Sequence, residues 1–81
     1  MIEKKIFLKT LDDVKTFVAI ATTKNYDIEL LSDKYVVNAK SVMGVLSLDL
    51  TSAVTMIANV ENDSKFLMEI EPFSAAIVSI K

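Results

Sequence analysis

The apolar residues of this chain change from strand-like to helix-like spacing and back within 81 residues, which limits its folds more than any other feature. Ile6 and Leu8 alternate with Lys5, Phe7 and Lys9, and this predicts a strand over 3–9. Over residues 12–24 the apolar positions instead follow helical spacing at i, i+3, i+4 and i+7: Val14, Phe17, Val18 and Ala21. A strand followed by an amphipathic helix is therefore expected at the start.

The middle of the chain continues this alternation. Residues 26–31 and 34–39 are β-rich runs separated by Ser32-Asp33, and they predict an antiparallel hairpin that includes Tyr26 and Tyr35. A short helix is expected over 41–48, followed by a strand over 54–60. One face of that strand carries alternating apolar residues: Val54, Met56, Ala58 and Val60.

A third helix completes the pattern. Asn62, Asp63 and Ser64 are candidate caps for it, and Pro72 should end it because proline disfavours helical geometry in the preceding residue. Residues 73–81 are apolar, and both an extra strand and a tail packed on a neighbour remain open for them. The order β-α-β-β-α-β-α predicts an α+β fold, an open-faced two-layer sandwich whose antiparallel four-stranded sheet is covered by helices on one face.

Size and apolar content bound the organisation of the protein. A chain of 81 residues predicts a single domain over 1–81. Apolar residues make up 52% and the mean hydropathy is +0.41, which favours an exposed apolar patch or a self-association surface such as a homodimer. No apolar run reaches the roughly 20 residues of a membrane span, and the start does not resemble a signal peptide. We therefore expect a cytoplasmic protein that does not bind membranes.

Charge and residue types exclude several functions. A net charge of −2 and a pI near 4.9 argue against direct nucleic-acid binding, which needs a basic face. The chain has neither cysteine nor histidine, so it lacks a thiolate, an imidazole base and the commonest metal ligands. The single glycine, Gly44, excludes a glycine-rich phosphate loop. We expect neither an enzyme nor a bound metal or cofactor.

The residues that carry functional information lie in the segment Lys40-Ser41-Val42-Met43-Gly44-Val45-Leu46-Ser47-Leu48. Ser41 is an N-cap type of residue, and its hydroxyl can accept a hydrogen bond from the first helical turn. The start of a helix also favours a negative charge such as a phosphate. Val42 and Leu46 are expected on one side with Met43 beside them, either as core or as an adaptable docking patch.

This segment resembles the Lys-Ser-Ile-Met-Gly-Val signature of HPr, the histidine-containing phosphocarrier of the bacterial sugar phosphotransferase system. The resemblance extends from about Ile6 to about Ile70 and includes the element order. It implies that Ser41 is the site modified by an HPr kinase and that Val42, Met43 and Leu46 dock protein partners. The partners implied are proteins of the phosphotransferase or carbon catabolite regulation systems, such as an HPr kinase or a transcriptional regulator.

The phosphoryl acceptor of the family is missing. The Gly-Ile-His-Ala-Arg-Pro loop of HPr proteins matches residues 10–15 here, so the histidine falls at or beside Asp12, a degenerate active-site position. The arginine and proline fall near Val14 and Lys15, so none of the three is retained in type. We interpret Asp12 and Asp13 as residues that cap the helix, with Thr10 and Asp13 forming an imperfect capping box. A narrower hypothesis is that Asp12 imitates the charge of a phosphorylated state.

The sequence therefore predicts a divergent HPr-like protein that works by regulation and partner binding, without phosphohistidine transfer. The catabolite-repression HPr-like protein, which also lacks the histidine and keeps the serine, is a precedent. Two alternatives remain open. One is a small α+β regulatory or ligand-binding module, and the other is a degenerate paralogue with a structural or oligomeric role.

Overall fold

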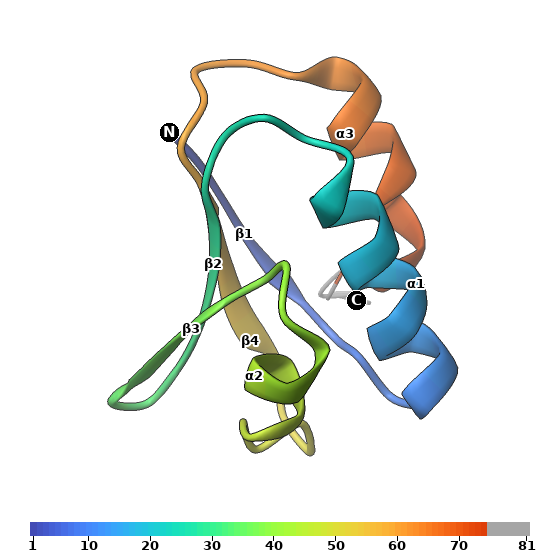
Figure 1. Ribbon diagram of the computed structural model, residues 1–81, viewed down its shortest axis with the longest axis vertical. Coiled ribbons are helices and arrows are strands. Elements are labelled where there is room, and N and C mark those ends of the chain that lie inside the picture. The colour runs from blue at the N-terminus through green and yellow to red at the C-terminus, as the bar shows by residue number, and fades with distance from the viewer. Residues whose placement is uncertain (75–81) are drawn as a thin grey trace, which may run out of the picture.

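The computed structural model describes residues 1–74 and confirms the predicted element order (Figure 1). The elements, in chain order, are β1 (Ile2–Ile6), α1 (Leu11–Thr22), β2 (Ile28–Ser32), β3 (Tyr35–Asn38), α2 (Val42–Leu46), β4 (Val54–Ala58), α3 (Ser64–Glu69) and a final 3₁₀ turn, η1 (Glu71–Phe73). Most are shorter than the sequence pattern predicts. The helix α3 ends at Glu69, before Pro72, which lies within η1.

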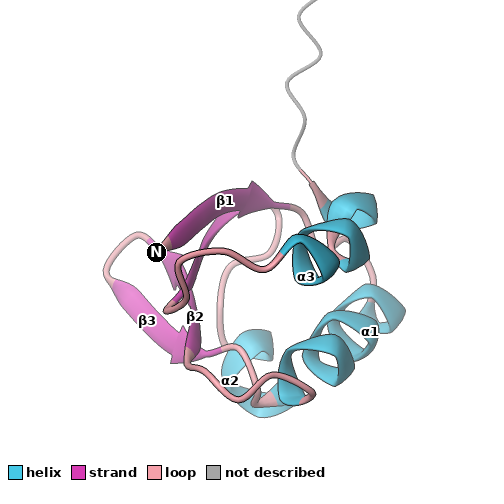
Figure 2. Ribbon diagram, turned by 90° about the horizontal axis from the view of Figure 1, so that it is seen from above, coloured by secondary structure: helices cyan, strands magenta, loops and turns pink. Residues whose placement is uncertain are grey.

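The sheet has four antiparallel strands in the order β1-β4-β2-β3. The helices lie on one side of this sheet and leave the other side open, as Figure 2 shows. The predicted α+β open-faced sandwich is therefore confirmed. The strand predicted to reach Lys9 ends at Ile6, because Ile6 pairs with Val54, the first residue of β4, and no partner in β4 remains beyond it.

The core lies between α1 and the sheet. The four residues of the predicted helical stripe are all buried: Val14, Phe17, Val18 and Ala21. Across from them the sheet and the loop after β1 contribute Ile6, Leu8, Val54 and Met56, which are also buried. The ring of Phe17 contacts the ring of Phe73 edge-on, with centroids 6.1 Å apart. Such aromatic contacts add to the stability that comes from burial alone, so Phe17 joins α1 to η1 at the centre of the core.

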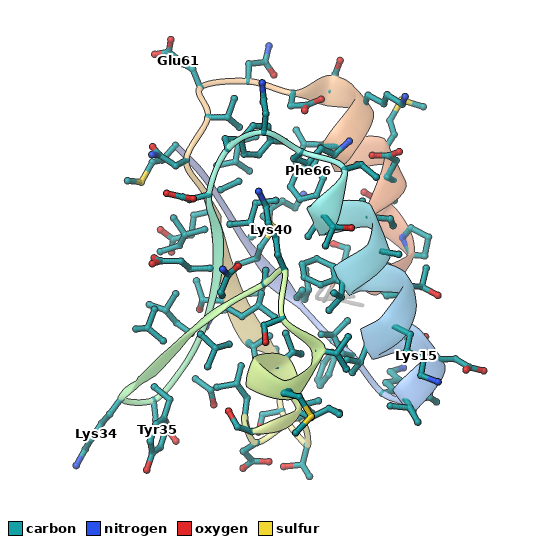
Figure 3. All side chains as sticks on the ribbon, viewed as in Figure 1. Lys15, Lys34, Tyr35, Lys40, Glu61 and Phe66 are labelled. Carbon is teal, nitrogen blue, oxygen red and sulfur yellow. The ribbon has the colours of Figure 1, made fainter. Side chains whose placement is uncertain are left out.

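The β2–β3 hairpin turns one residue later than predicted. Ser32 pairs with Tyr35, so the two-residue loop is Asp33-Lys34 rather than Ser32-Asp33. Asp33 has a φ of 53°, in the left-handed region that aspartate tolerates better than most residues and that tight hairpin turns require. Lys34 and Tyr35 point away from the body of the protein at this tip (Figure 3), and Tyr35 is 69% exposed.

Tyr26, predicted to belong to a strand, lies in the loop between α1 and β2. Its hydroxyl is not left to water: it donates a hydrogen bond of 2.8 Å to Oδ2 of Asp63, the N-cap of α3. The Tyr26 ring also contacts the ring of Phe66 edge-on. Partial burial, followed by the bond to Asp63, raises the pKa of Tyr26. This residue therefore attaches the start of α3 to the loop that follows α1, and its partner lies 37 residues away, too far for a periodic pattern to indicate.

Asp63 makes the stability of the protein dependent on pH in a defined direction. The backbone N–H of Phe66 and then the Tyr26 hydroxyl lower the pKa of this carboxyl. Its charged form therefore stabilises the fold above the unfolded pKa of about 4, and that contribution is lost as the pH falls through the folded value. The variant Asp63→Asn keeps a good N-cap but removes the charge.

We expect Asp63→Asn to melt below the wild type at pH 7, with the difference shrinking as the pH falls below about 4. Thermal unfolding of both proteins from pH 7 to pH 3 measures this. A difference that is constant over the whole range would show that the charge on Asp63 is irrelevant.

The chain returns to β1 at the end of the described region. Ser74 forms an isolated antiparallel bridge with Ile6, and the backbone N–H of Phe7 donates to the carbonyl of Phe73 at 2.7 Å. The apolar stretch 75–80, for which the sequence leaves an extra strand open, lies outside the described residues. Over residues 1–74, none of the helices is long and apolar enough to cross a membrane.

Candidate functional site

Ser41 begins α2 as predicted. Its backbone is extended, with φ −117° and ψ 114°, and its Oγ accepts a hydrogen bond of 3.1 Å from the backbone N–H of Gly44. Its own carbonyl accepts from the N–H of Val45 at 3.0 Å. This is the standard geometry of a serine N-cap, in which the side-chain oxygen satisfies an otherwise unpaired amide. The residue as a whole is partly exposed.

The apolar side chains of α2 divide between core and surface. Met43 is 79% exposed and Leu46 is 44% exposed, while Val45 is completely buried. Val42 is half-buried and packs against the core, so it contributes less to the surface than the predicted patch of Val42, Met43 and Leu46 implied. A helix of five residues can bury only one narrow face, and here Val45 occupies it. Two large apolar side chains therefore face solvent beside Ser41.

Lys40 links the start of α2 to α1. Its Nζ donates a hydrogen bond of 2.8 Å to the carbonyl of Lys24, near the end of α1, and its backbone N–H donates to Oδ1 of Asn38. The side chain rises from the loop before α2 toward the end of α1, as seen in Figure 3. The charge of Lys40 is thus engaged away from Ser41.

Lys24 extends this connection to α3. Its Nζ lies 2.7 Å from Oε1 of Glu69 and 5.5 Å from the centre of the Phe66 ring. The Lys24 side chain is only 10% exposed, so the ion pair is screened less than a fully exposed one. Lys24 is thus bonded to Lys40, which is 16 positions away in the sequence, and to Glu69, which is 45 positions away. No local pattern in the sequence signals these contacts, which is why sequence analysis missed them.

The first turn of α1 contains Asp12, the position inferred for the family histidine. Thr10 is the N-cap and its Oγ1 accepts from the N–H of Asp13 at 3.0 Å. Oδ2 of Asp13 accepts in return from the N–H of Lys9, so the imperfect capping box is present. Asp12 is exposed and lies two residues beyond the cap, inside the first turn. The residue that opens the helix is therefore Thr10, and Asp12 contributes only a negative charge beside it.

The described residues form a small hollow but no group of metal-binding side chains. Within residues 1–74, no three side chains of the types that bind metals lie close enough together to hold an ion. A hollow lies at the β2–β3 edge. Its volume of about 290 Å³ is close to the lower limit of the usual size for a ligand pocket. Its lining residues are Asp27, Ile28, Glu29, Val36, Val37 and Asn38. It includes none of the residues singled out in the α2 segment.

Neither a family model nor a curated protein sequence matches this chain, but solved structures do. HPr-C-His from Thermoanaerobacter tengcongensis is similar with a TM-score of 0.72 and 26% identity, covering 86% of each chain. The phosphocarrier protein HPr from Bacillus anthracis has a TM-score of 0.70 over 90% of this chain and 95% of that one. At 24% identity, that second likeness concerns the fold alone.

A third structure is more similar in sequence. It is Crh, the catabolite repression containing protein of Bacillus subtilis, whose structure is described as an intertwined dimer with a swapped domain. Identity is 33% over 84% of this chain and 79% of that chain, with a TM-score of 0.59. The element order, the four-stranded sheet with its helices on one face, and these likenesses agree. The chain belongs to the HPr family.

Proposed function

We propose that this protein is a regulatory member of the phosphotransferase system that binds protein partners and is phosphorylated on Ser41, without carrying phosphohistidine. The observation that carries the proposal is the start of α2, where a partly exposed serine N-cap adjoins two exposed apolar side chains, Met43 and Leu46. The chain has no histidine, so it has this surface but lacks the imidazole on which HPr proteins carry the phosphoryl group.

The exposed residues of α2 suit a docking surface. Leaving Met43 in water forgoes most of the roughly 1.5 to 3 kcal/mol that full burial of such a side chain adds, and the partly exposed Leu46 forgoes a smaller share. Methionine adapts its shape to different partners because its side chain is unbranched and flexible. The half-buried Val42 supports this surface from the core side. The partner proposed is a protein of the phosphotransferase or catabolite regulation system, such as an HPr kinase or a transcriptional regulator, in the cytoplasm.

Phosphorylation of Ser41 follows ordinary kinase chemistry. The Oγ of Ser41 attacks the γ-phosphorus of a nucleoside triphosphate bound by the kinase, and the bond from that phosphorus to the bridging oxygen breaks. The hydroxyl proton passes to a base of the kinase, and the nucleoside diphosphate leaves with Mg²⁺. The charge added at Ser41 changes the surface beside Met43, which provides a means to switch partner binding.

The Ser41 proposal is tested with an HPr kinase, ATP and Mg²⁺. We expect the protein to gain one phosphate, located on Ser41 by fragmentation mass spectrometry. Ser41→Ala should abolish the modification and lower the free energy of unfolding by about 0.5 to 2 kcal/mol, because the helix loses its cap.

Ser47 provides a matched control in the same segment. It is the C-cap residue of α2 and is also exposed, and its Oγ donates a 2.6 Å hydrogen bond to the carbonyl of Gly44. The variant Ser47→Ala should be phosphorylated as well as the wild type. A wild-type protein that remains unmodified, or a phosphate found on Ser47, would contradict the assignment of Ser41.

A further inference from the structure

Gly44 is the only glycine of the chain, and it stands in the middle of a helix. Glycine is the poorest helix former apart from proline, and it is usually retained where the backbone needs a positive φ. Gly44 does not have a positive φ. The backbone conformation therefore does not explain why a residue with no side chain stands at this position.

The space around Gly44 offers a different reason. A Cβ placed on Gly44 would lie 3.3 Å from Oγ of Ser41, and 3.5 Å from the Cβ atoms of Ser41 and Val37. The two contacts at 3.5 Å are ordinary van der Waals distances. The contact with the hydroxyl is tight, yet a shift of a few tenths of an ångström would relieve it. We therefore expect an unmodified Ser41 to accommodate a methyl group here if its hydroxyl shifts by that amount.

A phosphorylated Ser41 needs more space around its Oγ than an unmodified one. The phosphorus is bonded to the same Oγ, and three further oxygens surround it, each as large as the hydroxyl oxygen that a methyl group on Gly44 would already touch. A methyl group 3.3 Å from Oγ would leave no room for a phosphate oxygen between the two atoms. The N–H of Gly44, which now donates to Oγ, lies on that same side.

We propose that Gly44 keeps the space beside Ser41 Oγ open for a phosphoryl group. Its lack of a side chain benefits the phosphorylated protein and costs the unmodified protein helical stability. This inference rests on the proposed phosphorylation of Ser41, and it assigns to Gly44 a role that neither capping nor backbone geometry requires.

The test compares four proteins made by chemical synthesis, so that no kinase is needed: the wild type, wild type with phosphoserine at position 41, Gly44→Ala, and Gly44→Ala with phosphoserine at position 41. The measured quantity is the Tm of each. We expect phosphoserine to lower the Tm by at least about 4 °C more in the Gly44→Ala background than in the wild type. Gly44→Ala alone should stay within about 4 °C of the wild type, because better helix formation offsets the tight contact.

Met43→Ala is the control, since it shortens an exposed side chain in the same turn and should leave the effect of phosphoserine unchanged. An extra loss of Tm smaller than about 4 °C from phosphoserine in the Gly44→Ala background would overturn the inference. A large loss of Tm in unmodified Gly44→Ala would overturn it too, because glycine would then be required by the fold itself. Failure of a kinase to modify the wild type would instead contradict the proposed function, and the synthetic proteins separate the two results.

Discussion

Replacing Phe17 by alanine is expected to lower the free energy of unfolding by about 3 to 5 kcal/mol. Phe17 has no exposed surface, lies at the centre of the α1 face, and contacts the ring of Phe73 edge-on. Truncation would leave a cavity that the sheet and α1 cannot close, because both are held by other packed residues. A domain this small has only a few kcal/mol to lose, so much of the variant would be unfolded at room temperature.

Urea unfolding followed by circular dichroism measures this loss. Met43→Ala serves as the control, because Met43 is largely exposed and its truncation should change the free energy of unfolding by at most about 0.5 kcal/mol. An unfolding midpoint of Phe17→Ala equal to that of the wild type would mean that the α1 face does not form the core as described.

The second large effect is a complete absence of phosphotransfer from phosphoenolpyruvate. In a mixture with labelled phosphoenolpyruvate, the first enzyme of the phosphotransferase system and Mg²⁺, we expect no label on this protein, because no imidazole exists to form a phosphoramidate. Asp12 does not replace it: this carboxylate is exposed in the first turn of α1, and within residues 1–74 no group of acidic side chains gathers to hold a metal ion. Aspartyl phosphates form where such a metal neutralises the phosphate.

An HPr protein that retains its histidine is the positive control for this reaction. Stoichiometric label on the present chain would contradict the prediction. If that label were stable to acid it would lie on a hydroxyl, and if it were labile to both acid and hydroxylamine it would indicate an acyl phosphate on a residue such as Asp12.

Hydrophobic spacing is sufficient to predict the order of elements and the main contents of the core. The stripe on α1 and the inward residues of β4 follow directly from periods of 3.6 and 2, and they are buried. Spacing predicts these faces because burial of apolar surface is the largest favourable term in folding. In each helix or strand the buried residues must therefore recur with the period of that element. The N-cap at Ser41 is predictable for a similar reason, since capping depends on residues only three positions apart.

Within the candidate site, the tertiary structure decides which apolar side chains of α2 are exposed. The sequence predicts Val42, Met43 and Leu46 as one patch, but the direction in which α2 packs on the core leaves Met43 and Leu46 outside, Val42 half-buried and Val45 inside. A helix of a single turn has too few residues for its inward face to be assigned from spacing alone. The start of α1, by contrast, is set locally by the Thr10 cap, and it places Asp12, the position inferred for the family histidine, in the first helical turn.

The sequence by itself determined the α+β class, the order of the elements, the inward face of α1, the cap at Ser41 and the lack of an imidazole, because each depends on residue type or on neighbours within a turn or two. Only the tertiary structure decided how the ends of α1, α2 and α3 are joined. Lys24, Lys40 and Tyr26 reach partners 16 to 45 residues away, and whether such groups meet depends on how the helices cross the sheet. A hydrogen bond or ion pair acts over a few ångströms, so its partner is defined in space and leaves no periodic trace in the chain.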